Sequence, residues 1–82
     1  MTIREITTRM LIQIRSEKNR NHRITDKKIA EELGITPASF SRLITGVTEP
    51  KIMTWYKIYQ EYVKYMGIQR ANELMSKIEY DN

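Results

Sequence analysis

Two serines and an arginine stand close together in the stretch "TPASFSRLITG", and these are the side chains best suited to chemistry. Ser39 and Ser41 could act as nucleophiles only beside a general base. The single histidine, His22, belongs to a separate polar segment, so no nucleophilic triad is indicated. What the two hydroxyls can do together with the Arg42 guanidinium is form hydrogen bonds with a polar partner.

Acidic side chains and metal ligands offer no better site for catalysis. Glu31 and Glu32 are neighbours on a predicted helix and point about 100° apart, which suits a solvated face rather than a pair of catalytic carboxylates. The sequence has no cysteine, and His22 cannot form a zinc site alone. We therefore expect no enzymatic activity, no metal and no cofactor.

The charge is unevenly divided along the chain. Residues 1–46 hold nine of the fourteen lysines and arginines but five of the ten acidic residues, so they carry all of the net charge of +4. Residues 47–82 hold five of each sign. A basic half of this kind suits a polyanionic partner, and it equally suits a solvated basic face that binds nothing.

Length and hydropathy restrict the protein to a small class. The 82 residues fit one domain that cannot enclose a deep substrate chamber as well as a core. The opening "MTIREITTRM" carries charges where a signal peptide needs an apolar stretch, and no run of eighteen apolar residues exists. We therefore expect a soluble, cytoplasmic protein without a membrane-spanning segment.

Apolar residues recur at helical spacing through nearly the whole chain. The first helix, over residues 2 to about 18, is predicted from one stripe of side chains: Ile3, Ile6, Met10 and Ile14. A second short helix follows the polar segment "NRNHR", with Thr25 as its N-cap and Gly34 at its end. The inward residues of this second helix are predicted to be Ile29, Ala30 and Leu33.

The third helix restarts almost at once. Thr36 is its predicted N-cap, and Pro37 falls at the first helical position, where a fixed φ and a missing N–H cost nothing. Gly46 is predicted to end it. The inward residues are predicted to be Phe40, Leu43 and Ile44, and the outward ones Ala38, Ser41, Arg42 and Thr45.

Two further helices complete an all-α domain. The fourth, over about 51–65, is predicted to pack with one face, which consists of Ile52, Trp55, Tyr56, Tyr59, Tyr62, Val63 and Met66. Tyrosines spaced three apart drift about 60° per step around a helix, so they are expected in the core and not in a base-stacking ladder. The fifth helix has a narrower stripe: Ile68, Ala71, Met75 and Ile78. The sequence therefore predicts one domain over residues 1–82, a compact bundle of about five short helices in which only the terminal "YDN" frays.

Two short helices joined by a tight glycine turn, the second with a small polar outward face, are what a helix-turn-helix needs to enter the major groove of DNA. The stretch resembles the Cro and phage-repressor type of helix-turn-helix, the lambda repressor-like family, with the motif at about 25–45. The matching residues are Ile29-Ala30, Gly34, Ile35, Thr36, Phe40 and Gly46. The resemblance continues to Tyr62 through the Gly-x-x-x-Pro link in "GVTEP" and the apolar helix that follows.

The resemblance implies where DNA contacts lie. The expected base-edge contacts are Ala38, Ser39, Ser41 and Arg42. Arg42 can donate two hydrogen bonds to O6 and N7 of one guanine, unless it is an ordinary exposed arginine. The candidates for contact with the DNA backbone are Thr25, Lys27, Lys28, Thr36, Thr45 and Lys51, with Arg20 and Arg23 of the preceding loop.

Three positions depart from the family pattern. Asp26 stands where relatives often carry a glutamine that contacts phosphate, and its charge repels phosphate, so Lys27 or Lys28 is expected to replace it. Pro37 offers only apolar contact, for example to a thymine methyl group. Lys51 replaces the small polar cap usual after the link proline, and it is free to meet a phosphate at the N-terminus of the fourth helix.

The function that we expect is that of a transcriptional regulator, a repressor of phage or mobile-element type, that binds double-stranded DNA sequence-specifically. We expect a homodimer, either preformed or assembled only on DNA. The fifth helix offers Leu74 and Tyr80 for that contact, unless the helix merely closes the core. The alternative is a protein-interaction adaptor, of the antitoxin or anti-repressor kind, which has no need of Ser39, Ser41 and Arg42 beside a basic loop.

Overall fold

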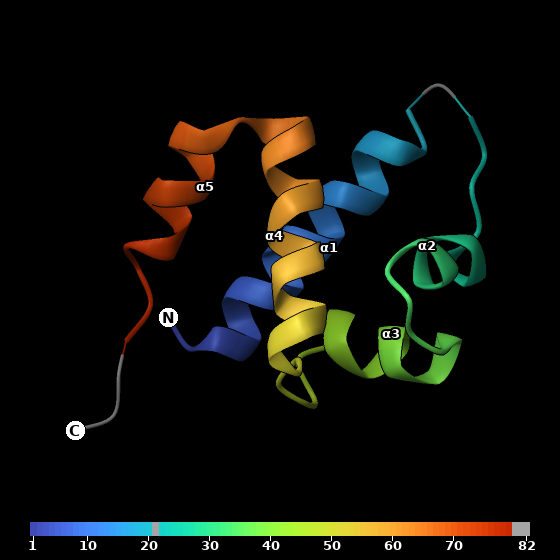
Figure 1. The fold of residues 1–82 in the computed structure, drawn as a ribbon, viewed down its shortest axis with the longest axis horizontal. Helices are drawn as coiled ribbons and strands as arrows, with labels where there is room; N and C mark the ends of the chain where they lie inside the picture. Colours follow the sequence, from blue (N-terminus) through green and yellow to red (C-terminus); the bar gives the residue numbers. More distant parts are fainter. Residues whose placement is uncertain (21, 80–82) are drawn as a thin grey trace.

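The computed structural model describes residues 1–20 and 22–79, and most of them lie in five α-helices (Figure 1). The helices are α1 (Ile3–Lys18), α2 (Asp26–Glu32), α3 (Pro37–Ile44), α4 (Ile52–Met66) and α5 (Ile68–Met75). The described residues contain no strand. The prediction of an all-α bundle of five short helices is therefore confirmed.

The helices are arranged around a central pair, α1 and α4, which pack against each other. α3 also packs against α1, and α2 packs against α3. α5 packs against α4 on the opposite side of the bundle from α2 and α3 (Figure 1). The two outer parts of the fold are therefore each held by a different member of the central pair.

The core is built on α1. Its Ile6, Met10, Leu11 and Ile14 are fully buried. Every other helix adds buried apolar side chains to the same cluster, together with Leu33 at the end of α2: Ile29, Ala30, Phe40, Leu43, Ile44, Ile58, Tyr62 and Ala71. Full burial of one large aliphatic side chain contributes about 1.5 to 3 kcal/mol, so the α1 face is a large part of the stabilisation.

The ends of the helices follow the predicted caps. The hydroxyl oxygens of Thr25 and Thr36 each accept a hydrogen bond of 3.1 Å from the backbone N–H three residues later. Gly34 and Gly46, at the ends of α2 and α3, have φ values of +72° and +77°, which favour glycine. Lys51 precedes α4 without a capping hydrogen bond from its side chain. These local predictions are confirmed.

The buried face of α4 differs from the predicted one. Ile58 and Tyr62 are buried, and Ile58 was not in the predicted stripe. Ile52 is 81% exposed and Tyr56 is also exposed, so the prediction that both pack in the core is wrong. The physical reason is that Tyr56 lies about 160° around the helix from Ile58, beyond the surface that α1 and α5 cover.

Two residues of α5 differ from the prediction in their burial: Leu74 is more buried and Ile68 is more exposed. Ala71 is buried, whereas Ile68 is exposed. Leu74 packs against the core cluster and is half-buried, so the fifth helix helps to close the core, and contact of Leu74 with a partner stays a prediction. Leu74 follows Ala71 by three residues and therefore shares its inward face. Tyr80 and the rest of the terminal "YDN" lie outside the described residues.

A nearly buried lysine joins three helices. The side chain of Lys18, at the end of α1, is 8% exposed. Its ammonium group donates hydrogen bonds to Glu32 Oε2 of α2 at 2.6 Å and to Tyr65 Oη of α4 at 3.4 Å. Glu61 Oε2 of α4 is buried without a hydrogen bond but lies 3.2 Å from the same ammonium. The Lys18–Glu61 contact is therefore an ion pair that holds α4 against α1.

The same contacts determine how Lys18 titrates. Burial by itself lowers the pKa of the Lys18 ammonium, but the hydrogen bonds to Glu32 and Tyr65 and the attraction of Glu61 outweigh burial and raise the pKa above its ordinary 10.5. A group whose pKa is higher in the folded state stabilises the fold fully below its unfolded pKa. The contribution of Lys18 is therefore complete at neutral pH and is lost only as the pH rises past its ordinary value.

We predict that Lys18→Met lowers the free energy of unfolding by about 1 to 3 kcal/mol, because Glu61 then remains largely buried without a counter-charge. Urea denaturation at about pH 7 and pH 9 measures the loss, which is expected to be the same at both. Arg20→Met is the control, because Arg20 pairs with Glu17 at the surface and exposed pairs contribute little. Equal losses in the two variants would contradict the role assigned to Lys18.

Candidate nucleic-acid interface

α3 lies at the edge of the bundle with one face toward the core and one toward solvent (Figure 1). The inner face consists of Phe40, Leu43 and Ile44, which are all buried. The outer face consists of Ala38, Ser41, Arg42 and Thr45, which are all exposed. This division is the predicted one, and it leaves small side chains and one guanidinium group on the accessible surface.

The turn over residues 33–36 fixes where α3 begins. The backbone N–H groups of Gly34 and Ile35 donate hydrogen bonds of 3.0 Å to the carbonyl oxygens of Glu31 and Ala30. Ile35 packs half-buried against the core. Thr36 then caps α3 directly. Because each of these residues is held by a hydrogen bond or by packing, α2 and α3 keep a defined orientation to each other.

Some of the α3 hydroxyl groups are engaged within the helix. Thr45 Oγ1 donates to the carbonyl oxygen of Ser41 at 2.7 Å, so toward a partner it can only accept. Ser39 is half-buried, and its Oγ accepts a hydrogen bond of 3.0 Å from Thr36 Oγ1. The Ser41 hydroxyl and the Arg42 guanidinium have no side-chain hydrogen bond to any described residue. These two groups are therefore the free polar groups of the face.

A hollow of about 460 Å³ lies beside the start of α3, between the α2–α3 turn and the beginning of α4. Four of the predicted contact residues line it: Thr36, Ser39, Arg42 and Lys51. Glu49 also lines the hollow and opposes the two positive charges in part. The structure therefore brings Lys51 to the same surface as the residues of α3, although it lies beyond the end of that helix.

The other residues that were predicted to contact the DNA backbone do not line this hollow. Lys27 and Lys28 are exposed in the first turn of α2, and Lys28 Nζ is 3.9 Å from Glu31 Oε2. The Thr25 hydroxyl is occupied as the cap of α2. Arg20 and Arg23 belong to the connection between α1 and α2, and neither lines the hollow beside α3. The structure therefore does not gather these two arginines onto the α3 face.

Two residues outside the predicted set influence this region. Arg15 Nη1 lies 3.4 Å from Asp26 Oδ2, so part of the charge that was expected to repel phosphate is compensated. Lys57 of α4 reaches the α2–α3 turn, where a Cβ on Gly34 would lie 2.7 Å from its Nζ. Its ammonium therefore lies near the C-terminal end of α2, where partial negative charge favours a cation. Residue spacing in the sequence does not predict either contact, because both contacts depend on how the helices pack against each other.

No family model, curated protein or solved structure matches this chain. Among residues 1–20 and 22–79, no three His, Asp or Glu side chains are grouped so that they could hold a metal ion. None of the helices in that part of the chain has the length and apolar character needed to cross a membrane.

We predict that Gly34→Ala lowers the free energy of unfolding by about 1 to 2 kcal/mol, because a residue with a side chain is strained at a φ of +72°. Gly34→Asn is the matched variant, since it also places a Cβ against Lys57 Nζ but tolerates the left-handed conformation better. Urea denaturation compares the two. If both variants lose the same amount, the contact with Lys57 and not the backbone conformation explains the glycine.

Proposed function

We propose that the protein is a sequence-specific double-stranded DNA-binding transcriptional regulator that inserts α3 into the major groove. The observation that carries this proposal is the outer face of α3, on which Ala38, Ser41 and Arg42 are exposed. An α-helix fits the major groove, and small side chains on its front allow close approach to the base edges. The resemblance of this stretch to the Cro and phage-repressor type supports the same reading and favours a repressor.

In this proposal, Arg42 and Ser41 read bases. The Arg42 guanidinium presents paired donors that match O6 and N7 of guanine, and the Ser41 hydroxyl can donate to or accept from a neighbouring base edge. Ser39 contributes the proton that its bond with Thr36 leaves free. Lys27, Lys28 and Lys51 neutralise phosphates on either side of the groove.

The dimer contact is proposed at exposed apolar side chains rather than at α5. Val47, Ile52, Met53 and Tyr56 are all exposed, and they lie in the α3–α4 connection and the first turns of α4. Because this patch follows α3 directly in the chain, pairing there fixes the separation of two α3 helices, which a palindromic site requires. The patch consists of few residues, which favours assembly on DNA over a stable free dimer.

A protein-interaction adaptor is the second candidate function, and the same apolar patch favours it. Exposed apolar side chains that lie together mark protein interfaces more often than open surface. An adaptor would use the patch for a different protein and would leave the outer face of α3 without a partner. DNA binding by that face distinguishes the two functions.

We predict that Arg42→Ala weakens binding to a preferred site by about 1 to 3 kcal/mol and hardly changes binding to random DNA, because the lost contacts are to one base pair. Lys27→Ala is the contrasting variant. It should weaken both kinds of binding alike and lower the salt dependence by about one counterion. Fluorescence anisotropy with labelled duplexes at several salt concentrations measures both effects. An equal loss on both DNAs for Arg42→Ala would reassign Arg42 to phosphate.

We predict that Ile52→Glu reduces cooperative binding to a palindromic site, because it places charge in the proposed apolar contact between copies. Binding to an isolated half-site should weaken much less, and only through the new charge beside Lys51. Gln69→Glu adds the same charge to an exposed position of α5, away from the first turns of α4, so it should leave cooperativity intact. Titration of one-site and two-site duplexes in a gel-shift assay gives both quantities. Undiminished cooperativity in the Ile52 variant would remove this patch from the interface.

A further inference from the structure

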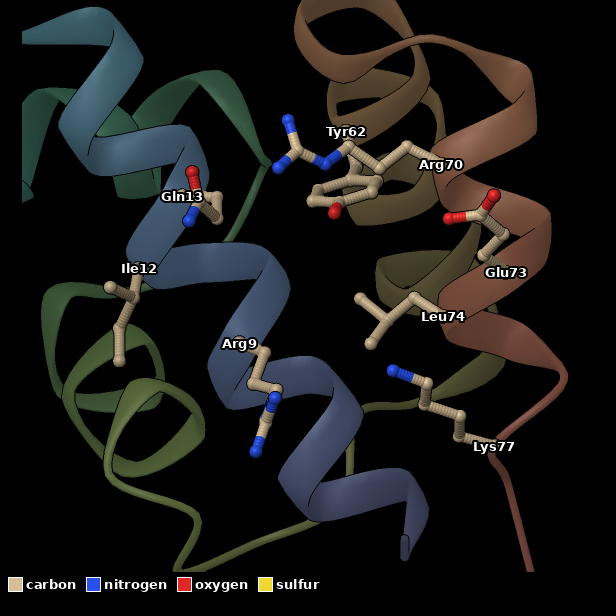
Figure 2. Close-up of a pocket in the computed structure, with 8 residues that line it drawn as sticks. All are labelled: Arg9, Ile12, Gln13, Tyr62, Arg70, Glu73, Leu74 and Lys77. Atoms are coloured by element: carbon tan, nitrogen blue, oxygen red, sulfur yellow. The ribbon is translucent and has the colours of Figure 1, made fainter.

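A groove of about 370 Å³ runs between α1 and α5 (Figure 2). Tyr62 of α4 lies between the two helices, Ile12 lines the α1 side and Leu74 the α5 side. The space between α1 and α5 is open because α5 packs mainly on α4. The Glu79 N–H donates a 2.7 Å hydrogen bond to the carbonyl oxygen of Met1, which holds the chain after α5 beside the start of α1. None of the residues assigned to DNA lines this groove.

The groove is rich in positive charge. Arg9, Arg70 and Lys77 line it, against one acidic residue, Glu73. Among the described residues, none of the three cations has a carboxylate within ion-pair distance. Figure 2 shows the Arg70 side chain of α5 and the Lys77 side chain of the turn after α5 reaching toward α1, whereas the Glu73 carboxylate lies beside α5 itself. The positive groups are therefore available to an anionic partner.

A tyrosine hydroxyl group also faces this space. The hydroxyls of Tyr59 and Tyr65 are hydrogen-bonded to Asn72 and Lys18 respectively. Tyr62 is 4% exposed, and its hydroxyl makes no hydrogen bond to a described residue. In Figure 2 this hydroxyl points into the space between α1 and α5. The Tyr62 hydroxyl oxygen is not among the buried polar atoms that lack a partner, so it is accessible from the groove and can donate to an acceptor bound there.

We propose that this groove binds an acidic segment of a partner protein. One carboxylate of the segment accepts the Tyr62 hydroxyl hydrogen bond and pairs with Arg70 or Lys77, and a neighbouring apolar side chain packs on Leu74. The three cations select for negative charge, and the apolar wall selects for a peptide rather than a bare polyanion. This proposal is independent of whether α3 binds DNA.

The dimensions of the groove favour a peptide over a small organic acid. Its α5 side extends from Arg70 to the end of the helix at Met75, about 8 Å along the axis, and continues to Lys77 in the turn that follows. Sites for small ligands bury most of the ligand surface, which an open groove between two helices does not do. A peptide instead gains contacts along the whole length, with its backbone in solvent on the outer side.

The test uses the full chain and an acetylated, amidated hexapeptide with two central leucines flanked on each side by two glutamates. Titration followed by ¹H–¹⁵N chemical shifts should move the amides around Tyr62, Arg70 and Lys77. Tyr62→Phe removes only the hydroxyl group and should weaken binding about tenfold. Lys77→Gln should weaken binding about two- to fivefold, whereas its matched control Lys64→Gln, on α4 outside the groove, should not.

Four results would overturn the proposal. The first is equal binding of the same peptide with glutamine in place of every glutamate, because it would remove the role of charge. The second is equally tight binding of N-acetylglutamate, because it would assign the groove to small acids. The third is full peptide affinity in both Tyr62→Phe and Lys77→Gln. The fourth is a lower salt dependence of DNA binding in Lys77→Gln, because it would make this groove part of the DNA surface.

Discussion

α1 provides the buried surface on which the other helices depend. Its Ile6, Met10, Leu11 and Ile14 are fully buried, and they face both α3 and α4. A chain of this length buries only about 60% of the surface that its unfolded form exposes, so one helix has to serve several neighbours. Lys18 extends this role, because its ammonium group reaches Glu32 of α2 and carboxyl and phenol groups of α4.

The same constraint leaves two surfaces uncovered. The inner face of α3 packs against α1. Its outer face does not pack against the core and can carry small polar residues and Arg42. α5 is held by α4, so the space between α5 and α1 remains open and gathers Arg70, Lys77 and the Tyr62 hydroxyl. In a fold with a single small core, each helix buries one side only, and the opposite sides are available for binding.

Local signals in the sequence predict the helix ends and the outer face of α3. Thr25 and Thr36 act on backbone groups within three residues, and Gly34 acts through its own φ, so no knowledge of the packing is needed. The buried face of α4 is not predicted by such local signals. Ile58 is buried and Tyr56 is exposed because of where α1 and α5 lie against the helix. The approach of Lys57 to Gly34, and the position of Lys51 at the same hollow as Arg42, likewise depend on tertiary arrangement.

The proposed function requires the outer face of α3 to read base edges. Selection of bound sequences from a pool of random DNA duplexes, with the full chain at low and at moderate salt, measures this property. We expect enrichment of one motif that contains a guanine, arranged as two half-sites about 34 to 36 Å apart. Recovery of sequences that cannot be distinguished from the starting pool at both salt concentrations would contradict it.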